Sequence, residues 1–179
     1  MFLKIRNATA NDAPAIAAIQ VAASQNAYAD IVSPDYLKRL TVQTRTSVWT
    51  QLITAASGPE QIMVGEEADL LCCYAHFGRS RDADATDTTG ELSSLYVHPG
   101  SWRRGFGRNL LTASMRRLGD LGFNDATLWV LAANSQARRF YERLGWDIDG
   151  TEKGPDNNVI KIRYRCQLPT GCVDLQSIR

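Results

Sequence analysis

The feature that most restricts the fold of this chain is a repeated change between short strand-like segments and longer segments with helical spacing. The apolar residues of 137–144 recur at i, i+3, i+4 and i+7, which indicates an amphipathic helix, and Gly145 is placed to end it. Just before this helix, residues 126–131 form a short apolar run typical of a buried strand. Segments of both kinds alternate along the chain, so the fold must combine helices with a sheet.

Followed from end to end, the alternation gives the order β-α-α-β-β-β-α-β-α-β-β, which implies a mixed α/β sheet. Six of these seven strands are placed by residue range, at 2–8, 61–65, 70–77, 91–97, 126–131 and 160–168. Helices are predicted around 16–23, around 48–55, over 105–121 and over 135–144, with a hairpin turn at 66–69 and a polar loop at 79–90. We expect one domain over residues 1–179, in which 169–179 form a tail.

The composition is that of an ordinary globular protein, with 44% hydrophobic and 22% charged residues among 179. A net charge of +1 argues against binding to nucleic acid or to an anionic membrane. No apolar run is long enough to span a bilayer, and the first residues lack the hydrophobic region of a signal peptide. We therefore expect an intracellular, cytoplasmic protein.

The cysteines do not suggest a metal or redox site. They are Cys72, Cys73, Cys166 and Cys172, and neither pair has the C-x-x-C spacing of such sites. We expect no bound metal and interpret these thiols as small buried or incidental residues.

The stretch HPGSWRRGFGRNLL (98–111) joins a predicted strand to a predicted helix and carries two glycines and three arginines. Gly105 and Gly107 leave backbone without a Cβ, so a ligand can approach their N–H groups closely. The start of the helix directs unpaired N–H groups and the positive end of its dipole at the same place. These features favour an anion site, most often for phosphate, although a tight turn with a solvated basic helix start accounts for the residues equally well.

Two familiar phosphate motifs do not fit this turn. A dinucleotide fingerprint needs a third glycine where this chain has Leu110, and a strand that ends directly at the turn. A P-loop needs Gly-Lys-Ser/Thr, whereas Arg108 and Asn109 follow Gly107.

Four segments in sequence resemble the GNAT superfamily of acetyl-CoA-dependent N-acetyltransferases: LYV, HPGSWRRGFGR, TLWVLAAN and SQARRFYERLGW. These motifs lie within 91–146, and the N-terminal AYADIVSPDYLKRL resembles one branch of the same family. The resemblance implies a mixed, mostly antiparallel sheet flanked by helices, with its central strands splayed apart. It also implies an enzyme that transfers acetyl from acetyl-CoA, its cosubstrate, to a primary amine by direct attack in a ternary complex.

The resemblance further implies which residues bind the coenzyme. The glycine turn would hold the pyrophosphate through backbone N–H groups, while the backbone of LYV and the amide of Asn134 would contact the pantetheine arm. The implied residues are Leu95, Tyr96, Val97, Arg103, Arg104, Gly105, Phe106, Gly107, Arg108 and Asn134. Asparagine is also favoured as a helix N-cap, so Asn134 has a structural role open to it as well. Trp102 departs from the family, which usually has Gln or Arg there, so any side-chain role at that position is in doubt.

Two residues are the candidates for proton transfer. Tyr141 matches the family's general acid, which protonates the departing thiolate, but it is also placed to be a core tyrosine. Glu91 matches a base in one branch of the family, and an ordinary carboxylate at the end of a strand is an equal interpretation. His76 and His98 are alternative bases, with roles as a core and a loop histidine respectively.

The acceptor is open between a small-molecule and a peptide amine. Candidate contacts are the aromatic residues Tyr28, Tyr36 and Trp49 and the loop residues Asp82, Asp84 and Asp87. The aspartates could attract a cationic amine, or they could form a solvated loop. A non-catalytic acyl-CoA-binding or sensing module is the alternative function, nucleic-acid binding is disfavoured by the balance of charges, and a homodimer is one of the open oligomeric states.

Overall fold

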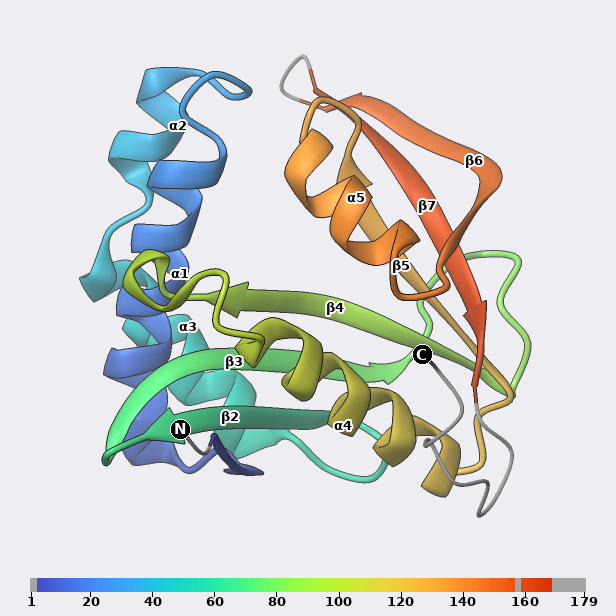
Figure 1. The fold of residues 1–179 in the computed structure, drawn as a ribbon, viewed down its shortest axis with the longest axis horizontal. Coiled ribbons are helices and arrows are strands. Elements are labelled where there is room, and N and C mark those ends of the chain that lie inside the picture. The colour runs from blue at the N-terminus through green and yellow to red at the C-terminus, as the bar shows by residue number, and fades with distance from the viewer. Residues whose placement is uncertain (1–2, 157–158, 169–179) are drawn as a thin grey trace.

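Seven strands form one sheet in the order β1-β2-β3-β4-β5-β7-β6 (Figure 1). The structure is a computed structural model that describes residues 3–156 and 159–168. The strands are β1 (Lys4–Asn7), β2 (Gln61–Glu67), β3 (Leu70–Arg79), β4 (Thr89–Val97), β5 (Asp125–Leu131), β6 (Asp147–Asp156) and β7 (Val159–Gln167). The helices are α1 (Ala13–Ala27), α2 (Pro34–Arg39), α3 (Val42–Ala55), α4 (Phe106–Asp120) and α5 (Ser135–Glu142), with short 3₁₀ turns at Ala10–Asp12 and Pro99–Ser101.

All neighbouring strands are antiparallel except β4 and β5, which are parallel. A parallel pair needs a crossover connection, and α4 supplies it. The two strands pair only at their beginnings, from Thr89 opposite Asp125 to Glu91 opposite Thr127. Beyond Glu91 they diverge, and Figure 1 shows β4 running away from β5 and β7. The predicted mixed, mostly antiparallel sheet with splayed central strands is confirmed.

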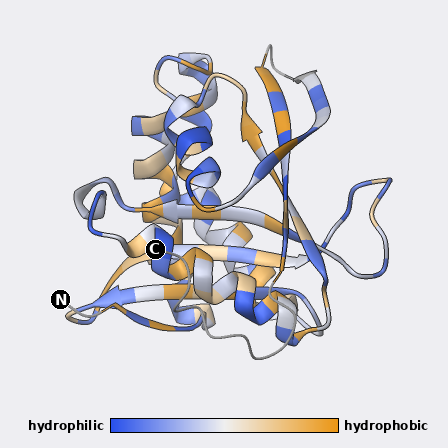
Figure 2. Ribbon diagram, turned by 45° about the vertical axis from the view of Figure 1, so that its right-hand side comes forward, coloured by the Kyte–Doolittle hydropathy of each residue, from blue (hydrophilic) through white to orange (hydrophobic). Residues whose placement is uncertain are grey.

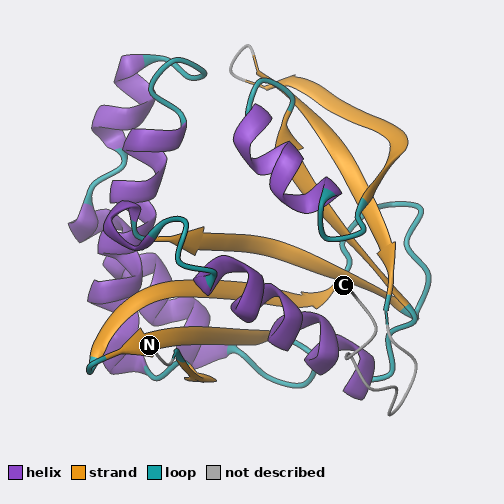
Figure 3. Cartoon of the chain, in the orientation of Figure 1, coloured by secondary structure: helices purple, strands orange, loops and turns teal. Residues whose placement is uncertain are grey.

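Helices cover both faces of the sheet (Figure 3). On one face, α1 and α3 pack against β2 and β3 through a core that includes Ile16, Trp49 and Tyr74. On the other face, Leu110 of α4 packs in a core that includes Phe77 of β3 and continues to the residues around α5. Figure 2 shows that hydrophobic and hydrophilic residues are interspersed along both the strands and the helices.

The predicted order of elements is confirmed, with the addition of α2. This short helix has Ser33 as its N-cap, whose hydroxyl accepts a hydrogen bond from the Tyr36 N–H at 3.2 Å. None of its residues is buried, so the sequence shows no apolar period there. In α3, where the apolar spacing of Val48, Leu52 and Ala55 predicts a shared buried face, Ala55 is instead exposed and Trp49 is the buried residue.

Residues 169–179, which include Cys172, lie outside the described residues. Among the described residues, no helix is long and apolar enough to cross a membrane.

Candidate active site

A cleft of about 1450 Å³ opens where β4 and β5 separate. The residues that line it come from β4, the turn before α4, β5 and α5, and from the end of α1, α2, β6 and β7. Most of the predicted site residues meet in this cleft: Glu91, Leu95, Tyr96, Val97, Arg103, Gly105, Phe106, Gly107, Arg108, Asn134 and Tyr141. Arg104 is the predicted residue that does not line it.

The register of β3 and β4 decides which backbone groups of β4 face the cleft. The His98 N–H donates to the Cys72 carbonyl at 2.8 Å, and Val97 lies opposite Cys73. In an antiparallel pair, hydrogen-bonded and non-hydrogen-bonded positions alternate, so the N–H and C=O of Val97 and of Leu95 point away from β3. They point to the side where β5 has separated, which leaves an open strand edge along the cleft. The backbone of Tyr96 is turned toward β3.

Trp102, the position that departs from the family pattern, closes part of this edge. Its indole N–H donates to the Val97 carbonyl at 2.7 Å. The indole thus satisfies one of the outward-facing acceptors of β4 and ties the turn to the strand. Three backbone groups, the N–H and C=O of Leu95 and the N–H of Val97, are left on this stretch of the edge for a ligand.

The glycine turn presents backbone donors to the same cleft. Gly105 is the N-cap of α4 with φ +82°, and Arg103 also has a positive φ of 62°. A Cβ on Gly105 would meet no atom within 4 Å, so its backbone conformation and not lack of space requires glycine. The first helical hydrogen bond runs from the Asn109 N–H to the Gly105 carbonyl at 3.0 Å. The N–H groups of Phe106, Gly107 and Arg108 therefore have no partner within the helix.

Gly107 is constrained differently from Gly105. A Cβ there would lie 3.3 Å from Cγ2 of Val97 and 3.5 Å from Cζ of Phe140, and its φ is not positive. The second glycine thus lets the start of α4 approach β4 and α5. Arg104 turns the other way, where it forms an ion pair with Glu67 at 2.6 Å.

Asn134 and Tyr141 are placed by α5. The predicted cap is confirmed, because the Asn134 side chain accepts a hydrogen bond from the Ala137 N–H at 3.0 Å. Tyr141 is 8% exposed and packs against the rings of Phe140, Trp146 and Tyr164.

The Tyr141 ring is in the core, but its hydroxyl makes no hydrogen bond with any residue that the structure describes. Burial raises the pKa of this phenol well above its usual range, and nearby Tyr96 raises it further. Tyr141 therefore stays protonated at neutral pH and can donate its proton in the cleft.

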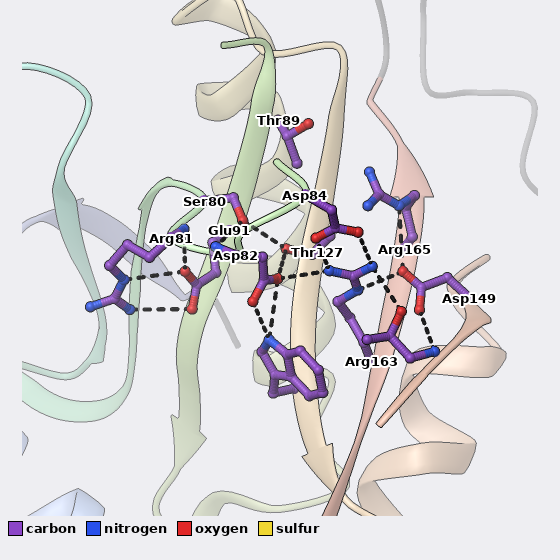
Figure 4. Close-up of polar contacts among 12 residues, drawn as sticks. Ser80, Arg81, Asp82, Asp84, Thr89, Glu91, Thr127, Asp149, Arg163 and Arg165 are labelled. Atoms are coloured by element: carbon purple, nitrogen blue, oxygen red, sulfur yellow. Dashed lines mark hydrogen bonds and ion pairs between the residues drawn. The ribbon is translucent and has the colours of Figure 1, made fainter. Parts of the chain in front are cut away.

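Glu91 is buried, with 11% of its side chain exposed, and it is held by one neighbour. Arg81 donates three hydrogen bonds to its carboxylate, from the backbone N–H and Nε at 3.3 Å and from Nη2 at 3.2 Å (Figure 4). A carboxylate can accept about four hydrogen bonds, so little of its acceptor capacity is left.

The two histidines lie away from the cleft lining. His76 is buried, its Nε2 hydrogen-bonds to the Glu60 carboxylate, and its ring meets the Trp49 ring edge-on at 5.9 Å. His98 caps the 3₁₀ turn that follows it, where its Nδ1 accepts a hydrogen bond from the Gly100 N–H at 3.2 Å. The core and loop roles weighed for these histidines account for both.

The polar loop between β3 and β4 is docked by charge onto β5, β6 and β7. Arg163 of β7 is 4% exposed and binds three carboxylates: Asp84 at 2.6 Å, Asp149 at 2.6 Å and Asp82 at 3.3 Å (Figure 4). Asp82 also accepts a hydrogen bond from Nε1 of Trp129 at 3.1 Å. Two of the three aspartates considered for a cationic acceptor are thus used inside the protein.

The residues of the cleft lining that were not predicted as site residues include Trp129, within the TLWVLAAN motif, and Lys153 and Lys161, outside every motif. Lys153 and Lys161 lie directly opposite each other on β6 and β7. Their proximity depends on the register of a hairpin, and no local pattern in the sequence indicates it.

These features define a class of protein: an α/β fold with splayed parallel strands, an open strand edge and a glycine turn that presents N–H donors beside it. The model of the acetyltransferase (GNAT) family matches residues 26–146. The chain belongs to the acetyltransferase (GNAT) family, as its motifs indicated.

Comparisons with individual proteins agree with this family. The chain is 31% identical over 98 residues to the L-amino acid N-acyltransferase MnaT of Escherichia coli (strain K12), a match that covers 55% of each chain. Matches to the curated relatives span about half of their length or less.

Among solved structures, the fold is similar to the PaiA N-acetyltransferase of Thermoplasma acidophilum in complex with coenzyme A. The TM-score is 0.76 at 17% identity, covering 91% of this chain and 98% of the other. YncA of Salmonella typhimurium, solved with acetyl-CoA, gives a TM-score of 0.71 at 21% identity and covers 98% and 99%. At these identities the likeness concerns the fold.

Proposed function

We propose that the chain is an N-acetyltransferase that transfers the acetyl group of acetyl-CoA to a primary amine. The observation that carries the proposal is the meeting of three features in one cleft. These are the open backbone edge at Leu95 and Val97, the unpaired N–H groups at the start of α4, and the buried, protonated Tyr141. The naming of the E. coli relative as an acyltransferase and the coenzymes bound by the two similar structures support it.

The coenzyme would lie along the splay. Its pyrophosphate would accept hydrogen bonds from the N–H groups of Phe106, Gly107 and Arg108, at the positive end of the α4 dipole. Arg103 and Arg108 line the cleft beside this turn and carry the complementary charge. The pantetheine amides would pair with the open edge of β4 as an added strand does, since each exposed N–H and C=O needs a partner.

The transfer balances without an acyl-enzyme. The amine nitrogen forms a C–N bond to the thioester carbon, the C–S bond breaks, the amine loses a proton and the thiolate gains one. Burial raises the pKa of the Cys73 and Cys166 thiols to about 12, so both stay protonated and are poor nucleophiles. These protonated thiols support our proposal of direct attack in a ternary complex, with Tyr141 as the acid that protonates the thiolate.

Glu91 is our proposed base for the amine proton. Arg81 occupies most of its acceptor positions, so the proton would reach Glu91 through a remaining lone pair or a bridging water. A route through water alone is the alternative. Glu91→Gln should lower turnover and shift its pH dependence if Glu91 is the base, and should leave the pH profile unchanged if water carries the proton.

The partner would be a small-molecule or peptide amine, and we place the reaction in the cytoplasm, with a homodimer as one arrangement of the chain. The alternative function, a non-catalytic acyl-CoA-binding or sensing module, would keep the coenzyme cleft and need no proton donor. Free thiol released from acetyl-CoA across a panel of amines distinguishes the two.

Tyr141→Phe is the sharpest test of the chemistry. It removes one hydroxyl and keeps the ring that packs in the core, so the melting temperature and coenzyme affinity should change little. Turnover with an identified acceptor should fall by roughly 10²-fold or more, the usual loss for a missing general acid. Phe140→Leu, which alters the neighbouring ring and leaves the phenol in place, is the control. A fully active Tyr141→Phe variant would remove Tyr141 from the mechanism.

A further inference from the structure

Two lysines face each other in the part of the cleft that the coenzyme residues do not occupy. Lys153 of β6 and Lys161 of β7 are register partners, and both line the cleft. Like charges directly opposite on neighbouring strands are destabilising. Such a pair in a cleft is an arrangement that a bound anion would relieve.

The surroundings of the pair differ between the two lysines. Lys153 forms an ion pair with Asp82 at 2.6 Å and lies 3.9 Å from the centre of the Trp129 ring. Lys161 has no ion-pair partner among the side chains that the structure describes. The other carboxylate of the loop that could reach this wall, Asp84, is taken by Arg163. A positive charge is therefore left in the cleft at Lys161.

The position of this charge separates it from the coenzyme site. Lys161 lies opposite Leu131 of β5, and Trp129 is two residues away on the same face of that strand. The cations assigned to the coenzyme come instead from the glycine turn. Across the cleft, β4 presents Ser93 and Glu91, whose carboxylate is paired with Arg81, so the unpaired charge of Lys161 faces acceptor groups of β4.

We propose that the acceptor is a small amino acid whose free carboxylate binds Lys161, while its amine lies toward Glu91 and the open edge of β4. Lys153 is already paired with Asp82, so the free charge is that of Lys161, and Trp129 provides a flat apolar surface for the acceptor side chain. A polyamine or another polycationic acceptor would be repelled by the unpaired charge of Lys161. This inference rests on the proposed acetyl transfer and adds the class of acceptor to it.

The test compares acceptors that differ only in the carboxylate. Each common L-amino acid is assayed for thiol release from acetyl-CoA beside its carboxamide, its decarboxylated amine and a dipeptide that begins with it. The preferred amino acid should exceed its carboxamide in kcat/KM by about tenfold or more, the effect of one charged hydrogen bond. Lys161→Gln should abolish that preference and leave the KM for acetyl-CoA unchanged, and Lys161→Arg should keep most of it.

Lys4→Gln is the matched control, because Lys4 lies on β1 at the far edge of the sheet and should not alter the preference. Equal use of amino acid and carboxamide, preference for the dipeptide, or an unchanged preference in Lys161→Gln would overturn the inference while leaving acetyl transfer intact. If no amine releases thiol, the proposed function fails and this inference fails with it.

Discussion

The half of the sheet formed by β1 to β4 and the half formed by β5, β7 and β6 are stabilised differently. The first half has helices on both faces, and its cores are built from apolar side chains such as Leu110 and Ile16. The second half has α5 on one face, while its other face carries the buried Arg163 and its carboxylates. One wall of the cleft is therefore fixed by apolar packing on both faces, and the opposite wall by apolar packing on one face and by charge on the other.

The difference matters because the two interactions tolerate change differently. Apolar packing is non-directional and scales with the area removed from water. The guanidinium of Arg163 instead matches its donors to three carboxylates and the Thr151 hydroxyl, a set that works only in one geometry. The half formed by β5, β7 and β6, which carries Lys153 and Lys161, should thus lose more stability when a single residue is substituted.

Arg163→Leu is expected to have the largest effect. It removes the buried cation and leaves Asp82 with Lys153 alone and Asp149 with the more distant Arg165, which should lower the free energy of unfolding by about 3–5 kcal/mol. Arg79→Leu is the control, because the Arg79–Asp87 pair is exposed and should contribute less than about 1 kcal/mol. Urea denaturation of both variants measures the difference. Equal losses would mean that the buried charges do not stabilise the second half.

Leu110→Ala removes apolar packing from the half formed by β1 to β4, as Arg163→Leu removes charge from the other half. Leu110 is fully buried, and the cavity should cost about 3 kcal/mol. This loss should be the same at pH 5 and pH 7, because no ionisable group is changed. The loss in Arg163→Leu should shrink at the lower pH, because an unpaired buried carboxylate has a raised pKa and takes up a proton. Parallel pH responses in the two variants would contradict the contrast between the halves.

Gly107→Val tests the start of α4, which lies beside the cleft between the two halves. The added side chain would crowd Val97 and Phe140 and push the start of α4 out of position. Acetyl-CoA affinity, measured by calorimetry on the folded variant, should fall by about tenfold or more, a larger effect than the loss of stability. Gly107→Ala adds only the Cβ and should give a smaller loss. Unchanged affinity in the valine variant would mean that the turn has no part in coenzyme binding.

The smallest expected effect concerns the charges at the outer edge of the first half. Arg6 and Thr9 hydrogen-bond to Asp12, and together they lower its pKa from 3.8 to about 2, against the opposing effect of burial. Because the folded-state pKa is the lower one, this stabilisation is complete above about pH 4 and is lost as the pH falls toward 2. Solvent reaches the pair, so we expect about 1 kcal/mol, measured as the stability gap between the unchanged chain and Asp12→Asn.

Two comparisons check this titration. The gap should close between pH 4 and pH 2 in acid denaturation curves, and the same change at the exposed Asp35 should alter stability less. A gap that persists at pH 2 would show that Asp12 acts through packing and not through its charge.

The elements that the sequence predicted are those with a local signal. The period of 137–144 gave α5, and the order of strands and helices gave the mixed sheet. Gly105 marked the start of α4, because only a residue without a Cβ adopts its backbone conformation at low cost. α2 escaped prediction because none of its residues is buried, and burial is what produces a helical period.

The sequence by itself therefore determined most of the elements, their order and the glycine turn, since each depends on residues within a few positions of one another. Tertiary structure alone decided that the indole of Trp102 binds the Val97 carbonyl, that Arg163 gathers the aspartates of a distant loop, and that Lys161 faces Lys153. The physical reason is that these contacts depend on strand register. The sequence also holds many more charged residues than form buried pairs, and it does not show which of them will pair. A shift of one residue in the β6–β7 hairpin would turn these side chains to the other face, and no local pattern fixes that register.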